Sequence, residues 1–380
     1  MYTRQLQPPK RSYLLLGPRG TGKTTWLNSF YPNATRYDLL KPSEFFRLQL
    51  DPERFEREVL ALPKGSTVVI DEVQKLPALL DVIHGLLSEK KAGHNFVMTG
   101  ASARKLKRSS ANLLAGRASF RQFFPLIQNE YLHVDSFDSV FKFGTLPEVF
   151  TAKNKSEQIE FLESYALTYL REEIQQEVAT KNIDSFSRFL NVAALCNAQV
   201  TNISSISRDA GVARSTVQGY FQALLDTLVG VWLPSWQPRA RVKEIEHPKF
   251  FFFDCGVARV LSGQVRESLS SMERGFLLET YLFHELRAWR EYQNNQAKIS
   301  YWKTKDSEVD FILELNGKVI GIEVKSTPHW KAEYGKTLHK LHEEKVVDQI
   351  YGVFLGERAQ KDGKLKILPL AAFLKELWQL

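Results

Sequence analysis

The sequence predicts a multidomain protein that begins with an α/β domain built on a parallel sheet. The chain has 380 residues, more than one compact core usually contains. Its residues are 43% hydrophobic and 25% charged, as in ordinary folded proteins, which excludes a disordered or collagenous chain. In residues 1–130, short β-branched or aromatic runs alternate with longer amphipathic stretches, a pattern typical of parallel strands joined by crossover helices.

The order of the elements divides the chain into three predicted parts, residues 1–135, 136–262 and 263–380. The first part contains the strand-like runs Tyr13–Leu16, Val68–Ile70, Phe96–Thr99 and Phe120–Phe124. In the second part, apolar residues recur every three or four positions through 159–174 and 186–195, which predicts helices. The third part begins with a long helix expected over 273–290 and continues with mixed strands and helices.

Residue usage narrows the class of protein further. Cys196 and Cys255 are the only cysteines and form no CxxC pair, so we expect neither a disulfide framework nor a structural zinc site. The first ten residues carry no apolar leader core, and no apolar run approaches the ~18 to 20 residues that span a bilayer. We therefore expect a cytoplasmic protein without a membrane partner. The formal net charge of +8 permits a polyanionic partner.

Residues 17–24 fit the phosphate-loop pattern G-x-x-x-x-G-K-[ST], after a strand-like run and before a helical stretch. The glycines let successive N–H groups point at a phosphate, while Lys23 neutralises the β- and γ-phosphates and the Thr24 hydroxyl reaches Mg²⁺. The alternative, a glycine-rich turn that only begins a helix, is disfavoured by this context. We predict ATP and Mg²⁺ as cofactors, held by Gly17, Pro18, Arg19, Gly20, Thr21, Gly22, Lys23, Thr24 and Thr25.

Two further strand-like runs end in polar residues. Thr67–Ile70 is followed by Asp71 and Glu72, and the carboxyl end of such a strand faces a nucleotide bound at the switch point of the sheet. Asp71 would hold Mg²⁺, and Glu72 would polarise the attacking water. The next run ends in the hydroxyls of Thr99 and Ser102, which either orient water beside the γ-phosphate or form a simple Ser/Thr turn.

A basic segment is the first candidate for contact with nucleic acid. Residues 101–121 contain six basic side chains and no acidic one, and a phosphate backbone would be a natural counter-surface. The alternative is a solvated charged face. The six side chains are Arg104, Lys105, Lys107, Arg108, Arg117 and Arg121.

A helix-turn-helix pattern over residues 203–228 is the second candidate. Gly211 makes the turn, and the outward face of the second helix carries hydrogen-bonding side chains suited to phosphates and base edges. Strands at 231–233 and 250–253 would flank a wing. The alternative is a winged helix used for packing or oligomerisation. The contact residues would be Arg214, Ser215, Gln218 and Gln222 on the helix, with Arg239, Arg241 and Lys243 in the wing.

A hairpin near the C-terminus brings carboxylates together. The runs 308–315 and 318–325 meet at Asn316-Gly317, the strongest short hairpin signal, so residues whose numbers sum to 633 should face each other. Asp310 then lies opposite Glu323 and Glu308 opposite Lys325, while the other face is apolar. Two carboxylates suit Mg²⁺ or Mn²⁺, and Lys325 could hold water or stabilise a phosphate. The alternative is a Glu308–Lys325 ion pair beside a hydrated Asp310.

These residues resemble a known family, the AAA+ type bacterial and archaeal ATPases that carry a C-terminal nuclease-like domain. The resembling stretches are GPRGTGKTT, VVIDEVQKLP, FVMTGAS, LLAGR, FPLIQNE, the helix-turn-helix segment, FFFFDCGVARVL, and EVDFI with IEVKS. The resemblance implies a P-loop AAA+ sheet, then a helical lid with a winged helix, then an α+β domain like that of restriction endonucleases. The family often has Gly-Gly before an aromatic-Pro-Glu, whereas here Gly144 stands alone before Thr145-Leu-Pro147-Glu148.

The resemblance also assigns roles. Thr99 or Ser102 looks like the sensor residue. Arg117 looks like an arginine finger that acts on a neighbouring subunit, which implies a homo-oligomeric ring such as a hexamer. For the nuclease-like domain, the residues that match the PD-(D/E)xK pattern are Asp310, Glu323, Lys325 and, as a third carboxylate, Glu279.

Together these features lead us to expect an ATP-hydrolysing, Mg²⁺-dependent AAA+ machine that acts on DNA and docks through its winged helix. Two alternatives stay open on sequence grounds. One is a nucleotide-dependent switch whose nuclease-like domain only binds a partner. The other is an ATP-gated endonuclease.

Overall fold

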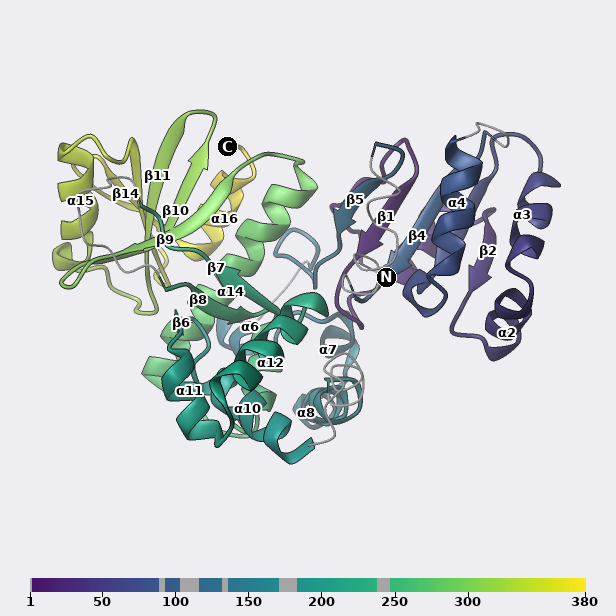
Figure 1. The fold of residues 1–380 in the computed structure, drawn as a ribbon. Coiled ribbons are helices and arrows are strands. Elements are labelled where there is room, and N and C mark those ends of the chain that lie inside the picture. Colours follow the sequence, from purple (N-terminus) through teal and green to yellow (C-terminus); the bar gives the residue numbers. More distant parts are fainter. Residues whose placement is uncertain (1, 89–92, 103–115, 132–135, 171–182, 238–246) are drawn as a thin grey trace. The chain divides into compact units, whose positions relative to one another are not determined.

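The computed structural model describes residues 2–88, 93–102, 116–131, 136–170, 183–237 and 247–380 (Figure 1). The chain forms two compact units. The first comprises Met1–Leu126 with Leu225–Val229, and the second comprises Ile127–Leu224 with Gly230–Leu380. The predicted division into three domains stays a prediction. Among the helices described, none is long and apolar enough to cross a membrane.

The first unit is built on a five-stranded parallel sheet of order β2-β3-β4-β1-β5. The α/β prediction for this part is therefore confirmed. One strand, β2, has no counterpart among the predicted runs, because it lies at the edge of the sheet and buries only one side chain, Tyr37. The strands are β1 (Tyr13–Leu16), β2 (Thr35–Asp38), β3 (Thr67–Asp71), β4 (Asn95–Gly100) and β5 (Ser119–Gln122).

Helices cover this sheet and bury an aliphatic core that includes Leu14, Ile70 and Met98. Pro42 and Pro52 stand in the first turns of α2 and α3, where a missing N–H costs nothing. The described helices of the unit are α1 (Lys23–Phe30), α2 (Pro42–Leu50), α3 (Pro52–Leu60), the 3₁₀ turn η1 (Val73–Lys75) and α4 (Ala78–Ser88).

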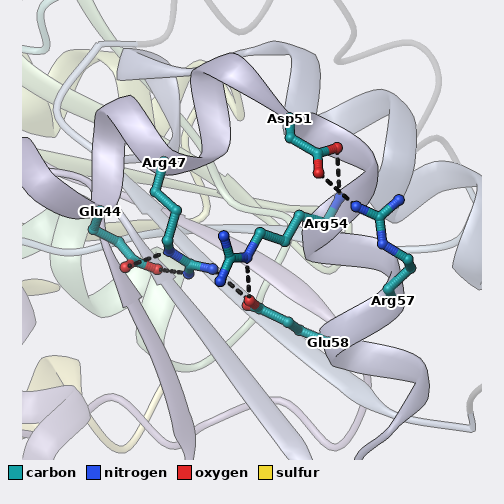
Figure 2. A network of polar contacts seen from close by, with 6 residues as sticks. All are labelled: Glu44, Arg47, Asp51, Arg54, Arg57 and Glu58. Carbon is teal, nitrogen blue, oxygen red and sulfur yellow. Dashed lines mark hydrogen bonds and ion pairs between the residues drawn. The ribbon is translucent and has the colours of Figure 1, made fainter.

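A network of ion pairs joins α2 to α3 (Figure 2). Arg47 on α2 pairs with Glu44 at 2.5 Å and with Glu58 on α3, and Arg54 reaches the same Glu58 carboxylate at 3.0 Å. Asp51, between the helices, accepts a hydrogen bond from Arg54 N–H and caps α3. The network fixes the angle between two short helices that bury few side chains.

The second unit begins with a largely helical part, as the sequence predicts. The predicted helix over 159–174 is described as α8 followed by a π-helical turn up to Leu170, and its last residues lie outside the described ones. The helices are α6 (Phe137–Phe143), α7 (Pro147–Thr151), α8 (Lys155–Ser164), η2 (Tyr165–Leu170), α10 (Ile183–Leu195), α11 (Ile203–Ala210), α12 (Arg214–Asp226) and α13 (Cys255–Leu261).

Helices α11 and α12 are joined by a tight turn at Gly211, which has a left-handed φ of 66° and ends α11. An antiparallel sheet of order β6-β8-β7 accompanies them. Its strands are β6 (Gln199–Val200), β7 (Gly230–Leu233) and β8 (Lys249–Phe252).

The backbone of Gly144, at the end of α6, packs closely against the side chain of Asp254, which caps α13. Gly144 ends α6 with φ 75° and ψ −163°, and a Cβ there would lie 2.0 Å from Asp254 Oδ1. Asp254 is buried, caps α13 by accepting from Val257 N–H at 3.1 Å, and accepts from Thr145 N–H at 2.6 Å. Burial raises the pKa of Asp254 to about 6, although these hydrogen bonds act against the shift. The single glycine of the Gly144-Thr145 segment is therefore required by this contact.

The remainder of the second unit is a six-stranded mixed sheet of order β13-β14-β12-β11-β10-β9. Strands β11, β12 and β14 run parallel, and the other neighbours are antiparallel. The predicted helix over 273–290 is confirmed as α14. The elements are α14 (Ser271–Tyr292), β9 (Lys298–Lys303), β10 (Glu308–Leu315), β11 (Lys318–Lys325), η3 (Ala332–Gly335), α15 (Lys336–Glu343), β12 (Gln349–Phe354), β13 (Gln360–Asp362), β14 (Leu365–Pro369) and α16 (Leu370–Leu377).

A fully buried carboxyl on α14 anchors the segment at the start of the second unit. Glu285 accepts a hydrogen bond from Gln128 N–H at 2.7 Å. One turn before it, Tyr281 bonds to the hydroxyl of Tyr131. Burial raises the pKa of Glu285 to about 8. The start of the second unit is thus attached to α14 through hydrogen bonds to a carboxyl whose protonated form is favoured by burial, against the effect of the bond from Gln128 N–H.

Candidate functional site

The phosphate loop has the backbone that its glycines predict. Gly20 and Gly22 have φ values of 77° and 90°, which other residues rarely adopt. A Cβ on Gly17 would lie 2.3 Å from the carbonyl oxygen of Phe123, so the loop packs directly against the chain after β5. Helix α1 begins at Lys23, at the end of the loop. The loop N–H groups and the N-terminus of α1 therefore belong to one concave backbone segment, a geometry suited to anions.

Lys23 lies over its own loop. Its Nζ donates to the carbonyl oxygens of Gly17 at 2.7 Å and Pro18 at 3.0 Å, and the residue is buried. Thr21 likewise turns inward and donates its hydroxyl to Pro18 O at 2.8 Å. The ammonium is thus held at the loop by weak neutral acceptors, which a phosphate group could replace.

Two predicted residues, Thr24 on α1 and Thr99 on β4, contact a third, Asp71, at the end of β3. The Thr24 hydroxyl donates to Asp71 Oδ2 at 2.8 Å, and the Thr99 hydroxyl donates to Asp71 Oδ1. Asp71 and Thr99 are buried, while Thr24 is exposed. A hydroxyl beside a carboxylate at the phosphate loop is a donor set that fits Mg²⁺ bound with a nucleotide. Of the two candidate sensor residues, Thr99 is the one that contacts Asp71.

Glu72 has a strained backbone. Its φ of 59° and ψ of 47° are left-handed, and its N–H donates to the Thr99 hydroxyl at 3.0 Å. Its carboxylate accepts from the side-chain amide of Gln74, a buried residue that the sequence reasoning missed. Non-glycine residues in this conformation cost of order 1–3 kcal/mol and cluster at functional sites. The left-handed backbone ends the extended conformation of β3 at Glu72, and the Gln74 amide holds the Glu72 carboxylate.

Arg4 contacts the phosphate loop through its guanidinium group. Sequence reasoning missed this residue too. Its guanidinium donates to Thr21 O at 2.8 Å and to Phe124 O at 2.5 Å. It stacks on the ring of Phe123 at 4.1 Å, and the residue is 7% exposed. We call this contact set, Arg4 with Thr21, Phe123 and Phe124, the Arg4 clasp. It joins the N-terminal segment, the phosphate loop and the chain after β5, three segments that no local motif connects.

The other predicted nucleotide-site residues are placed as follows. Ser102 is buried two residues beyond β4. Arg117 is exposed two residues before β5. Arg19 and Thr25 are exposed on the loop and on the first turn of α1. The exposure of Arg117 is compatible with the role that the resemblance gives it, which stays a prediction.

Most of the predicted nucleic-acid contacts fall outside the described residues. This applies to Arg104, Lys105, Lys107, Arg108, Arg239, Arg241 and Lys243. Of the basic segment, Arg117 is described as exposed and Arg121 as half-buried. Arg214 and Gln218 lie exposed on α12 together with Ser215 and Gln222. The opposite face of the helix buries Val217, Tyr220 and Leu224. The predicted division of α12 into a buried face and an outward polar face is therefore confirmed, whereas DNA contact stays a prediction.

The register of the C-terminal hairpin is confirmed from Leu315↔Lys318 to Phe311↔Ile322. Beyond this point the backbone ladder ends. Asp310 instead uses its carboxylate to accept from Val324 N–H at 2.7 Å. A carboxylate that bonds to the neighbouring strand replaces the backbone partner that the simple register assigns.

The alternative interpretation of the hairpin is wrong on both points. Glu308 pairs with Lys303 and with Lys249 rather than with Lys325, whose partner is Glu323. Asp310 is 7% exposed and is not a hydrated surface acid. We call these acidic residues the carboxylate cluster: Asp310 on β10 and Glu323 on β11, which are buried, and Glu279 on α14 and Glu308 on β10, which are partly buried.

Lys249, the first residue of β8, lies within this cluster. Its Nζ is 2.9 Å from Glu279 Oε2 and 2.7 Å from Glu308 Oε1. Burial raises the pKa of Glu279 to about 7, the charges of Asp310 and Glu308 add to the shift, and Lys249 opposes it. Burial, followed by the charge of Asp310, also holds the pKa of Glu323 well above its usual range, against Lys325. Sequence reasoning missed Lys249, because nothing in a strand of aromatic residues points to an acidic partner.

A resident metal ion does not fit this arrangement. Within the described ranges, no group of three or more His, Cys, Asp or Glu side chains is placed to hold one. The position between Glu279 and Glu308 is taken by an ammonium group. The metal-ligand roles predicted for Asp310 and Glu323 are therefore not supported by the geometry.

Family models match three consecutive parts of the chain. Residues 9–132 match the model described as "AAA domain". Residues 134–268 match "Domain of unknown function (DUF8612)", and residues 274–373 match "Domain of unknown function (DUF4143)". Together with the five-stranded parallel sheet and its phosphate loop, the first match supports an AAA-type ATPase domain in the N-terminal part.

Two relatives with similar sequences are described as uncharacterized proteins. A protein of Mycobacterium tuberculosis is 27% identical over 326 residues, which cover 83% of this chain and 70% of that protein. A protein of Methanocaldococcus jannaschii is 22% identical over 334 residues, which cover 80% of this chain and 72% of that protein. The similarity extends beyond the nucleotide-binding part to most of the chain.

Two solved structures are similar to parts of the chain. A Walker-type ATPase of Pyrococcus abyssi has a TM-score of 0.45 and 14% identity, covering 66% of this chain and 90% of that one. The RuvB Holliday junction branch migration motor of Thermotoga maritima has a TM-score of 0.31 and 14% identity, covering 59% of this chain and 82% of that one.

Proposed function

We propose that this protein is an ATP-hydrolysing AAA+ machine that acts on DNA in the cytoplasm as a homo-oligomeric ring. The observation that carries the ATPase part is the meeting of Thr24, Asp71 and Thr99 beside the Lys23 ammonium. These groups come from the phosphate loop and from two neighbouring strand ends, the edge where nucleotides bind in parallel sheets. An AAA-type family match over residues 9–132 agrees with this.

In the proposed reaction, Lys23 exchanges its loop carbonyls for phosphate oxygens. Thr24 and Asp71 would hold Mg²⁺, which neutralises charge on the β- and γ-phosphates. Glu72, held by Gln74, would accept a hydrogen bond from the attacking water. Thr99 keeps the Asp71 carboxylate oriented. An exposed arginine from a neighbouring subunit, Arg117, would stabilise the charge of the transferring phosphoryl group.

DNA is the proposed polymer because α12 presents Arg214, Ser215 and Gln218 on an outward face after a tight turn, and because the chain carries a net charge of +8. Strand cleavage is not part of this proposal. ATP-driven movement or remodelling of DNA requires only the nucleotide site and a DNA-binding surface.

The test is steady-state ATP turnover of the full chain with single-stranded, duplex and branched DNA. Lys23→Ala should reduce turnover by at least roughly 100-fold, whereas Lys10→Ala, at an exposed lysine before β1, should not. Arg214→Ala should weaken DNA stimulation, whereas Lys361→Ala on the exposed strand β13 should leave it unchanged. Turnover that no DNA alters would reject the DNA part. ATP retained without turnover would indicate a nucleotide-dependent switch instead.

A further inference from the structure

We infer that Lys249 is the resident cation of the carboxylate cluster, so that the cluster binds neither Mg²⁺ nor Mn²⁺ while this lysine is in place. The inference goes beyond the proposed ATPase function and concerns a different part of the chain. It assigns a structural role to residues whose pattern suggests a nuclease site.

The Lys249 ammonium group occupies the position between two of the carboxylates. Lys249 is 3% exposed, and its Nζ bonds to Glu279 on α14 and to Glu308 on β10 at 2.9 Å and 2.7 Å. The ring of Tyr301 closes a third side, with Nζ 5.3 Å from its centre. Divalent cations need oxygens at about 2.0 to 2.6 Å. An ion that used Glu279 and Glu308 as ligands would occupy the space that Nζ fills.

The formal charge of the cluster also disfavours a divalent cation. The cluster has four carboxylates, and three ammonium groups are paired with them. Lys303 is bonded to Glu308, and Lys325 is bonded to Glu323. Even with every carboxyl ionised, the formal charge of the group is −1, so a divalent cation would leave an excess of positive charge around Lys249, Asp310 and Glu323, which are buried. Unpaired charge at buried groups is strongly unfavourable.

Carboxylate oxygens without a hydrogen-bond partner would remain in the cluster if Lys249 were removed. Glu323 Oε2 is buried and has no hydrogen-bond partner among the described residues. Glu279 Oε2 and Glu308 Oε1 would lose their bonds to Nζ. With Asp310, these side chains offer oxygens of the kind that Mg²⁺ and Mn²⁺ prefer, but among the described residues no three acidic side chains are placed to hold an ion. Loss of Lys249 would free two of these oxygens, and the carboxylates would then have to shift to surround a metal ion.

Lys249 and its carboxylate partners come from different elements of the second unit. The lysine belongs to β8, which pairs with β6 and β7, whereas the carboxylates belong to α14 and the six-stranded sheet. The ion pairs join these two sheets within the second unit. The cluster then serves to fix β8 on α14 and β10, and the wild-type protein should not cleave DNA through it.

The test measures Mn²⁺ binding to the nucleotide-free full chain by isothermal titration calorimetry and by thermal unfolding. Lys249→Met keeps the length of the side chain and removes its charge. It should gain about one Mn²⁺ equivalent and show an unfolding temperature that rises with Mn²⁺. Both effects should disappear in Lys249→Met combined with Asp310→Asn. The matched control, Lys361→Met, should behave as wild type, and Mn²⁺ bound elsewhere is unchanged by Asp310→Asn.

Two results would overturn the inference. One is a Mn²⁺ equivalent in the wild-type protein that Asp310→Asn removes. The other is a folded Lys249→Met protein that gains no Mn²⁺. If Lys249→Met does not fold, the comparison of wild type with Asp310→Asn still decides, together with Lys249→Arg, which retains the charge and should bind no additional Mn²⁺. ATP turnover by the same preparations tests the proposed function separately, because Lys249 lies outside the nucleotide site.

Discussion

Replacing Gly144 by alanine should destabilise the protein by about 3 to 6 kcal/mol at pH 7.5. Gly144 has φ 75° and ψ −163°, a region essentially restricted to glycine, where a side chain costs about 1–3 kcal/mol. The added Cβ would lie 2.0 Å from Asp254 Oδ1, so the carboxylate must move and lose its 2.6 Å bond to Thr145 N–H. A hydrogen bond to a charged group contributes about 1.5–3 kcal/mol.

The assay is urea unfolding of the full chain, followed by tryptophan fluorescence. Gly219→Ala is the matched control, because Gly219 is exposed on α12 and an added Cβ would meet nothing within 4 Å. This control should stabilise the protein by about 0.5–1 kcal/mol, the usual advantage of alanine in a helix. A loss of less than about 1 kcal/mol for Gly144→Ala would refute the argument that Gly144 and Asp254 lock α6 to α13.

Three further outcomes are expected. Because burial raises the pKa of Glu285 from 4.5 to about 8, its contribution to stability is complete below about pH 4.5 and declines as the pH rises to 8. The slope is up to about 1.4 kcal/mol per pH unit; Glu285→Gln should flatten it in urea unfolding, and an unchanged slope would contradict the burial argument. Thr24→Val should raise the Mg²⁺ concentration for half-maximal ATP turnover by roughly 10- to 100-fold, since the hydroxyl beside Asp71 is lost; a shift below twofold would remove Thr24 from the metal-binding set. Arg47→Met should cost about 1 kcal/mol in 50 mM salt and less in 1 M salt, because its partners Glu44 and Glu58 are partly exposed; equal losses at both salt concentrations would indicate packing rather than charge.

The nucleotide site is largely predictable from the sequence because its residues belong to short local motifs. The phosphate loop follows a buried strand, Asp71 and Thr99 lie at the carboxyl ends of two others, and parallel strands place such ends at one edge. Arg4 follows from no such rule. Its partner carbonyls lie 17 and 120 residues away, and carbonyl oxygens have no side-chain identity that a sequence could display.

The C-terminal hairpin follows the register that its turn predicts only as far as Phe311. Asn316-Gly317 fixes the turn and the register as far as Phe311, because turn chemistry is local. The pattern then fails at Asp310, whose side chain competes for a backbone N–H of the next strand. The partner that decides the character of the cluster, Lys249, comes from a strand 59 residues before Glu308. Carboxylate spacing alone therefore predicts a metal site where tertiary structure supplies a lysine.

The Arg4 clasp has a practical consequence for anyone who produces this protein. The guanidinium that steadies the nucleotide-binding backbone lies before β1 and outside the phosphate motif. Versions shortened to begin at β1 would leave the carbonyls of Thr21 and Phe124 without this donor. They would keep every residue of the phosphate motif and still hold that motif less firmly.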